Sequence, residues 1–219
     1  MTPISLKAND YSNPNYIGSI FRKKRFKFFE EKIANLKKPV SILDIGGTVR
    51  FWVDENYHEK DVEITIVNLR TEVSPYSNIK VIIGDACDLS ALADKSFDVV
   101  FSNSLIEHLY TKENQFRMAR EAMRVGKYFF IQTPNRYFPI EPHFKFPLFQ
   151  FLPEAAQVFL QTKTHLINGQ RYNRDYAENI VKEIKLLTGK EMKEFFPMGS
   201  LYVERFLGLP KSFVAYNLP

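Results

Sequence analysis

The chain has 219 residues, of which 45% are hydrophobic and 25% charged, and its one cysteine is Cys87. This apolar fraction is too high for a disordered chain, and the length suits one domain, residues 1–219, with a substantial core. A lone cysteine excludes an internal disulfide and a zinc site built on several thiolates. No apolar run reaches about 18 residues, and the start shows no secretory signal, so we expect a soluble, cytoplasmic protein.

The net charge of +5 is concentrated in an N-terminal basic segment, residues 1–38. Residues 1–16 are rich in Asn, Pro, Ser and Tyr and are expected to be irregular. Residues 22–38 hold eight Lys or Arg against two Glu, within a helix predicted over 18–37. In one interpretation this is a solvated helix whose apolar side chains turn inward, namely Phe21, Phe28, Ile33 and Leu36. In the other it is a patch for an anionic partner: a phosphorylated substrate, anionic lipid or RNA.

Short apolar runs bounded by turn residues follow, as is typical of buried parallel strands. They lie at 40–45, 62–69, 79–83, 97–101 and 125–132. A helix is predicted over 112–124, capped by Thr111, with Phe116, Ala119 and Met123 (or Ala122) facing the sheet. Strands that alternate with helices predict an α/β fold with a doubly wound, Rossmann-like, mostly parallel sheet.

The C-terminal part adds two runs at 201–206 and 212–216, which predict an antiparallel hairpin at the sheet edge and about seven strands in all. Thr188 and Glu191 form a capping-box pattern that opens a short helix. Between the fifth strand and this tail, residues 134–175 form an insertion rich in proline and aromatic residues, which we interpret as a lid or substrate wall. Its aromatic side chains form either a core or that wall: Tyr137, Phe138, Phe144, Phe146, Phe149 and Phe151.

The ends of the predicted strands carry turn and polar residues, and ligands bind at the carboxyl ends of strands in open α/β sheets. The first strand ends in Asp-Ile-Gly-Gly-Thr at 44–48, the second in Asn-Leu at 68–69, the third in Gly-Asp-Ala at 84–86 and the fourth in Ser-Asn-Ser-Leu at 102–105. The chain has neither the GxxxxGK[ST] nor the GxGxxG pattern. These strand ends suit a nucleoside that carries an amino-acid arm, because together they offer a tight turn, an amide, a carboxylate and a polar strand end.

These motifs resemble those of class I S-adenosylmethionine-dependent methyltransferases of the bacterial small-molecule or glycan type. The segments that carry the resemblance are ILDIGGT, VIIGDACDL, FDVVFSNSLIEHL and the closing VERFLGLPKSFVAY, within roughly 40–132 and 184–217. The resemblance implies S-adenosylmethionine as the cofactor. It implies contacts from Asp44, Gly46 and Gly47 at the methionine end, Asn68 and Leu69 at the ribose and adenine, Asp85 and Ala86 at the adenine, and Asn103 and Ser104 near the sulfonium.

Two residues depart from the family pattern. Thr48 stands where a glycine is common, and Asn68 replaces the acidic residue that usually binds both ribose hydroxyls. An amide lacks the charge-assisted hydrogen bonds of a carboxylate, so we expect weaker cofactor binding than is usual in the family.

Three residues are candidates for catalysis, because a hydroxyl acceptor benefits from a base or a metal that removes its proton. Glu107 and His108 follow the fourth strand, and His143 lies in the insertion; a structural role is the alternative for both histidines. In the resembling ubiquinone-pathway O-methyltransferases, a Glu-x-x-Glu-His stretch here can bind a divalent metal. Ser104 stands at the first of those positions, so we expect no metal site.

We therefore predict a methyltransferase acting on a hydroxyl, or secondarily an amine, of a small molecule or a glycan such as a nucleotide-linked sugar. The aromatic insertion suits a sugar ring, and the basic helix suits a phosphate on the acceptor. Nucleic acid is not favoured, because only one basic cluster and no added RNA-binding domain are present. The alternatives are an RNA-associated or membrane-associated methyltransferase that uses residues 22–38, and a cofactor-binding scaffold without catalysis.

Overall fold

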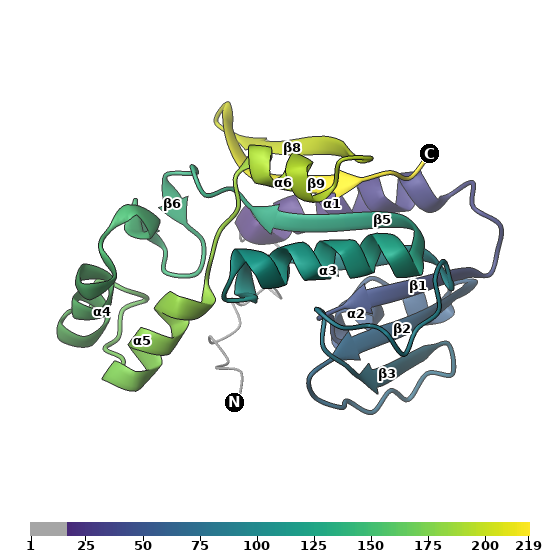
Figure 1. Cartoon of the computed structure of the whole chain (residues 1–219), viewed down its shortest axis with the longest axis horizontal. Helices are drawn as coiled ribbons and strands as arrows, with labels where there is room; N and C mark the ends of the chain where they lie inside the picture. Colours follow the sequence, from purple (N-terminus) through teal and green to yellow (C-terminus); the bar gives the residue numbers. More distant parts are fainter. Residues whose placement is uncertain (1–16) are drawn as a thin grey trace.

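The computed structural model describes residues 17–219, so the irregular segment expected over 1–16 lies outside the described residues. Seven strands form one sheet in the order β3-β2-β1-β4-β5-β9-β8 (Figure 1). Its five parallel strands are β1 (Val40–Ile45), β2 (Val62–Asn68), β3 (Ile79–Ile83), β4 (Phe97–Asn103) and β5 (Gly126–Pro134). The hairpin of β8 (Ser200–Phe206) and β9 (Leu209–Tyr216) adds to β5 in antiparallel orientation. The predicted doubly wound sheet and its closing hairpin are confirmed.

Helices cover both faces of the sheet, because successive side chains of each buried strand point to opposite faces. Ile42 and Val99 pack with α1 (Ile17–Ile33) and α2 (Val49–Asp54) on one face. Their neighbours Leu43 and Val100 pack with α3 (Lys112–Val125) and α6 (Gly189–Phe195) on the other. Short 3-10 turns, η1 (Tyr57–Glu59) and η2 (Ile106–His108), follow α2 and β4.

Helix α1 combines both interpretations of the basic segment. Phe26, Phe29 and Ile33 are buried against the sheet, whereas Phe21, Phe28 and Leu36 are half-buried. Most of its lysines are exposed, but Arg25 is turned inward and only 8% exposed. The basic side chains therefore point in two directions, some to solvent and one into the protein.

The predicted orientation of α3 is wrong at one position. Phe116 is 39% exposed and contacts Phe195 with ring centroids 5.8 Å apart. The buried residues are Gln115, Met118, Ala119, Ala122 and Val125. The buried face therefore starts at Gln115, a polar residue whose amide donates to the carbonyls of Ile106 and Lys185. Because its amide makes these hydrogen bonds, Gln115 can be buried at the position that the hydrophobic pattern predicted for Phe116.

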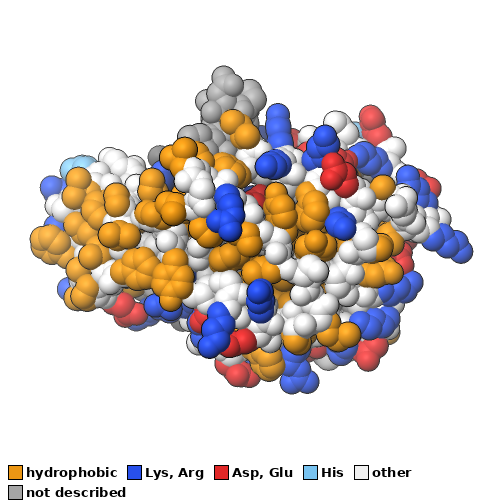
Figure 2. Space-filling model, turned by 90° about the horizontal axis from the view of Figure 1, so that it is seen from above, with side chains coloured by type: hydrophobic (Ala, Val, Ile, Leu, Met, Phe, Trp, Pro, Cys, Tyr) orange, Lys and Arg blue, Asp and Glu red, His pale blue; other side chains and the backbone are white. Residues whose placement is uncertain are grey.

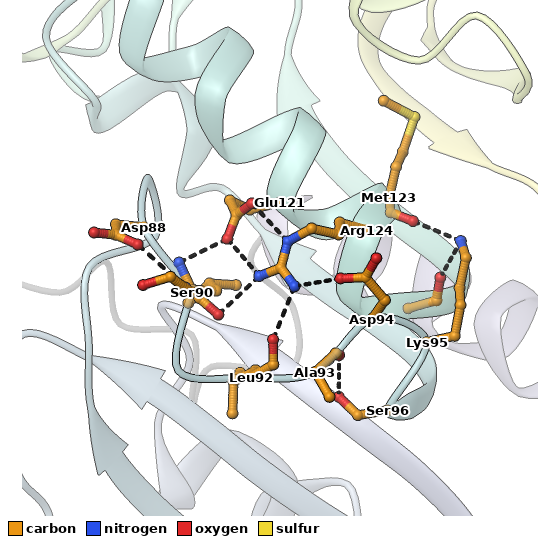
Figure 3. Close-up of polar contacts among 12 residues, drawn as sticks. Asp88, Ser90, Leu92, Ala93, Asp94, Lys95, Ser96, Glu121, Met123 and Arg124 are labelled. Carbon is orange, nitrogen blue, oxygen red and sulfur yellow. Dashed lines mark hydrogen bonds and ion pairs between the residues drawn. The ribbon is translucent and has the colours of Figure 1, made fainter.

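The loop between β3 and β4 is fastened to α3 by Arg124 (Figure 3). The guanidinium donates to the carbonyls of Leu89 and Leu92, at 2.8 Å each, and pairs with Asp94 at 2.7 Å. Glu121 pairs with Arg124 and accepts from the backbone N–H of Leu89 at 2.8 Å. These bonds fix the loop that contains Asp85, at the carboxyl end of β3.

The insertion lies beside the sheet, beyond the end of β5 (Figure 1). It contains β6 (Ile140–Glu141), β7 (Phe146–Pro147), η3 (Phe149–Phe151) and α4 (Glu154–Lys163), and α5 (Arg174–Glu183) follows it. Together with α5 it forms a small separate core, made of Phe144, Phe149 and Ile167 from the insertion and Ile180 from α5. Within residues 17–219, no helix has the length and apolar character that a membrane span requires.

Candidate active site

The turn after β1 is held by backbone and side-chain hydrogen bonds. Gly46 has a φ of +82°, which favours glycine, and its N–H donates to the carbonyl of Val67 at 2.8 Å. Asn68, at the end of β2, donates from Nδ2 to the Gly47 carbonyl at 3.1 Å. Two neighbouring strand ends are thus bonded to each other, and the turn is fixed in place.

Asp44 supports this turn from below. Its side chain is 1% exposed and accepts from the indole N–H of Trp52 at 2.7 Å. A Cβ at Gly47 would lie 1.7 Å from Asp44 Oδ2, so the carboxyl group packs directly under that glycine. Burial raises the pKa of Asp44 to about 7, and the hydrogen bond from Trp52 opposes this effect.

A cavity of about 360 Å³, which we call the strand-end cleft, opens at the carboxyl ends of β1 to β4. This volume is within the range of small-molecule sites. Its walls combine apolar side chains with a few polar groups, as such sites do. The lining residues are Gly46, Val67, Asn68, Leu69, Gly84, Asp85, Ala86, Leu105, His108, Leu109, Tyr110 and Glu183.

Asp85 has both of the roles that an aspartate after a strand can take. Its Oδ1 accepts from the backbone N–H of Cys87 at 2.8 Å, which caps the turn, and the residue also lines the cleft. At another part of the cleft, Tyr110 and Glu183 contribute a hydroxyl and a carboxylate. Burial and then the charge of Glu183 raise the pKa of Tyr110 above its ordinary value.

A second cavity of about 470 Å³, the basic pocket, lies next to the cleft. Asn103 and Ser104 line this pocket and the next residue, Leu105, lines the cleft, so one loop borders both cavities. Four of the lining residues are basic, namely Arg22, Arg25, Lys145 and Lys211, and three are large and apolar, namely Phe138, Ile140 and Phe206. None of the described residues that line it is acidic. The pocket is therefore suited to a ligand with an anionic group and an apolar or ring-shaped part.

Arg25, which is buried, and Lys211, which is half-buried, are two cations of this pocket. Arg25 bonds to Glu204 at 3.2 Å and to Asn103 Oδ1 at 2.5 Å, which fixes its guanidinium. Burial, and then the charge of Arg25, lower the pKa of Lys211, while Glu204 opposes them. An anion in the pocket would offset the repulsion between the two cations.

The three candidate catalytic residues come together where the insertion meets the cleft. Glu107, His108 and His143 each place one potential ligand atom within 4.8 Å of the others. The two imidazole rings meet edge to face, with centroids 4.9 Å apart. His108 Nδ1 is 2.9 Å from Glu183, and His143 Nδ1 is 2.6 Å from Glu141. We call these five residues the His–Glu cluster.

The sequence did not reveal the two outer carboxylates of this cluster. Glu141 also accepts from the backbone N–H groups of His143 and Phe144, so it holds the loop as well as the ring. Burial lowers the pKa of His143, but Glu141, Glu107 and Glu183 outweigh it and raise the pKa above its ordinary value. No local motif points to Glu183, because it reaches His108 from a helix 75 residues further along the chain.

Residues 46–131 match the family model described as a methyltransferase domain. The matched segment, 86 of the 219 residues, runs from the turn after β1 into β5. An uncharacterized protein of Mycobacterium tuberculosis strain H37Rv is 27% identical over 115 residues, which is 52% of this chain and 38% of that protein. The matched segment thus spans well under half of that relative's own length.

Two solved structures share the methyltransferase fold of this chain. The PH0226 protein of Pyrococcus horikoshii has a TM-score of 0.57 and 18% identity, over 95% of this chain and 94% of its own. An S-adenosylmethionine-dependent methyltransferase of Methanosarcina mazei has a TM-score of 0.51 and 16% identity, over 84% and 93%. At these identities the comparison concerns the fold alone.

The strand-end cleft fits S-adenosylmethionine. Apolar walls suit a purine, a carboxylate can accept from its exocyclic amine, and an amide can bond ribose hydroxyls. The cleft includes five of the nine residues predicted to bind the cofactor: Gly46, Asn68, Leu69, Asp85 and Ala86. Asn103 and Ser104 lie instead in the basic pocket, and Asp44 lies beneath the turn, away from the cleft. Gly47 is bonded to Asn68 through its carbonyl and is not among the lining residues.

Proposed function

We propose that this protein transfers a methyl group from S-adenosylmethionine to a hydroxyl of a small molecule or glycan that carries phosphate, such as a nucleotide-linked sugar. The observation that carries the proposal is the basic pocket, which adjoins the strand-end cleft through residues 103–105. In this arrangement the donor occupies the cleft and the acceptor the pocket. The loop after β4 lies between the two reacting groups.

On the donor side, Asn68 and Asp85 would hold the ribose and adenine, and Gly46 would lie near the methionine part. The bound donor supplies an electrophilic methyl on a sulfonium. The chain itself has to bring the nucleophile into line with that methyl, and such alignment is a large part of the rate enhancement in displacement reactions.

On the acceptor side, Lys211 and Arg25 would bind the phosphate, and Phe138 and Phe206 would pack on the ring. Arg25 is already fixed by Glu204 and Asn103, so little side-chain entropy is lost when it binds an anion. His108 lines the cleft and belongs to the His–Glu cluster, so this cluster would lie beside the bound donor.

The test uses three acceptors with a radiolabelled methyl donor: a nucleoside-diphosphate sugar, the corresponding sugar 1-phosphate and the unphosphorylated sugar. We expect the phosphorylated acceptors to be methylated faster. Lys211→Met should raise their KM severalfold, whereas Lys27→Met, which changes an exposed lysine of α1, should leave it unchanged.

Two outcomes would contradict the proposal. Methylation that depends on neither phosphate nor Lys211 would remove the basic pocket from acceptor binding. Protein that binds the donor but methylates nothing in a broad screen would favour the cofactor-binding scaffold.

A peripheral membrane methyltransferase is the second candidate. Figure 2 shows hydrophobic side chains gathered over the end of the molecule that holds the insertion. The exposed apolar residues of this region are Tyr137, Ile140, Leu148, Phe151, Phe159 and Leu166. Together with the exposed lysines of α1, they suit a surface of anionic lipid. Cosedimentation with anionic but not neutral vesicles would support this candidate, and no cosedimentation with either would reject it.

A further inference from the structure

Glu107 is a buried carboxylate, and one of its two oxygens accepts no hydrogen bond. The residue is 0% exposed, and its Oε2 accepts from the hydroxyl of Thr133 at 3.0 Å. Its Oε1 is buried and has no hydrogen-bond partner. A buried carboxylate oxygen without a partner is costly, so an orphan of this kind calls for an explanation.

Glu107 lies close to two histidines, His108 and His143, and a carboxylate orients each of them. Since Nδ1 of His108 is bonded to Glu183 and Nδ1 of His143 to Glu141, Nε2 is the nitrogen that each ring has left for a ligand. In metal sites, a carboxylate or carbonyl on the outer nitrogen of a ligating histidine fixes the ring and its tautomer. Both histidines here have such a partner.

The net charge of the His–Glu cluster also favours a bound cation. It contains three carboxylates, those of Glu107, Glu141 and Glu183, which are 0%, 1% and 9% exposed. Even two protonated imidazoles would leave the cluster negative. A divalent cation bound by the neutral imidazoles would reduce the net charge of the cluster from −3 to −1 and give the orphan oxygen of Glu107 a partner.

We infer that Glu107, His108 and His143 bind a divalent metal ion at the junction of the insertion and the strand-end cleft. Two imidazole nitrogens and one carboxylate suit Zn²⁺, and also Fe²⁺, Co²⁺ or Mn²⁺. A tetrahedral ion with bonds of about 2.1 Å holds its ligand atoms about 3.4 Å apart. The ligand atoms lie within 4.8 Å of one another, so metal binding would have to draw them closer by up to about 1.4 Å.

This site differs from the Glu-x-x-Glu-His arrangement considered above. Ser104 takes the place of the first glutamate, and its hydroxyl bonds to Gln132 at 2.8 Å. The structure instead brings in His143 from the insertion. Three protein ligands leave one position of a tetrahedral ion open, and His108 lines the cleft, so this position would lie beside the cleft that we assign to the donor.

The experiment measures metal binding directly and needs neither methyl donor nor turnover. Tag-free protein is stripped with a chelator, and Zn²⁺ and Co²⁺ are then titrated by calorimetry and by visible absorption of the Co²⁺ complex. We expect one ion per chain and a higher unfolding temperature with metal. Glu107→Gln and His143→Ala should weaken binding by about 100-fold or more, because loss of an outer partner alone costs about 10-fold to 100-fold.

His165→Ala is the matched control, since His165 is an exposed histidine that follows α4. It should change the metal affinity less than twofold. Far-ultraviolet circular dichroism without metal shows whether each variant is folded, and Glu107→Gln, which keeps the shape of the side chain, is the decisive one. The absence of one-to-one binding by the wild type would overturn the inference, as would equal affinity in wild type and Glu107→Gln. The result is independent of donor binding, so either proposal can fail without the other.

Discussion

The strand-end cleft and the His–Glu cluster are built in opposite ways. Each polar group of the cleft follows a strand directly, and parallel strands bring these ends together whatever the rest of the chain does. The cluster takes His108 from η2, His143 from the insertion and Glu183 from α5. Its geometry therefore depends on how the insertion packs. A donor site can be anticipated from local sequence, whereas the chemistry beside it depends on contacts between distant segments.

The largest effect is expected at the turn after β1, on the cleft side of this comparison. In Gly47→Ala the new Cβ would lie 1.7 Å from Asp44 Oδ2. Asp44 is held by Trp52, so the turn has to move. We expect a loss of about 2–3 kcal/mol in the free energy of unfolding and more than a tenfold loss of donor affinity, measured by urea denaturation and calorimetry.

Gly169→Ala, in the loop before α5, is the control for this substitution. Gly169 has a φ of +70° but nothing within 4 Å of its Cβ position. It should lose only about 1 kcal/mol, from backbone strain, and keep its donor affinity. Equal effects of the two substitutions would show that the contact with Asp44 does not matter.

The pH dependence of stability tests the buried carboxyl group beneath that turn. The ordinary pKa of an aspartate side chain is 3.8, and burial raises the pKa of Asp44 to about 7 in the folded protein. Between these values the folded state keeps a proton that the unfolded state has lost, so wild-type stability falls as pH rises from about 4 to about 7. Asp44→Asn keeps an acceptor for Trp52 and removes this proton. Relative to the variant, the wild type should lose up to about 1.4 kcal/mol per pH unit in this window, and parallel curves would contradict the account.

A smaller effect is expected where α3 holds the loop after β3. Arg124→Met removes hydrogen bonds to two carbonyls and two ion pairs (Figure 3). Because the side chain is 28% exposed, we expect a loss of about 2 kcal/mol in the free energy of unfolding. Arg120→Met, an exposed position of the same helix, should stay within about 0.5 kcal/mol. A loss at Arg124 no larger than that at Arg120 would mean that solvent replaces these bonds.

The smallest effect concerns the departure from the family pattern at Asn68. A carboxylate usually binds ribose better, but here Nδ2 donates to the Gly47 carbonyl at 3.1 Å. Asn68→Asp would lose this bond and place a negative charge against a carbonyl oxygen. Calorimetry should show donor affinity reduced about fivefold, or about 1 kcal/mol. Tighter binding would show that the ribose contact outweighs the support of the turn.

The sequence predicted the fold well because buried parallel strands carry a local signal. The runs at 40–45 and 79–83 coincide with β1 and β3, and the capping box of Thr188 and Glu191 is present. The face of α3 was less predictable, because hydrogen bonds bury Gln115 in place of Phe116. The basic helix could not reveal that Arg25 turns inward, since that orientation depends on Glu204 of β8.

Within the site, the strand-end cleft could be predicted from the sequence, whereas the His–Glu cluster could not. Asn68 and Asp85 could be placed at the cleft from their positions after strands, and the structure has them there. The proximity of His143 to His108 could not be derived, because no periodicity relates a short hairpin of the insertion to η2. Glu141 and Glu183 were missed for the same reason.

The most direct test of the central claim is calorimetric titration of the wild type with S-adenosylmethionine and S-adenosylhomocysteine, repeated on Asp85→Ala. Asp88→Ala is the control, since Asp88 is in the same loop but does not line the strand-end cleft. The account predicts micromolar binding that Asp85→Ala weakens tenfold or more, about 1.4 kcal/mol, and that Asp88→Ala leaves unchanged. Folded protein that binds neither ligand, or that binds both equally well without the Asp85 carboxylate, would contradict it.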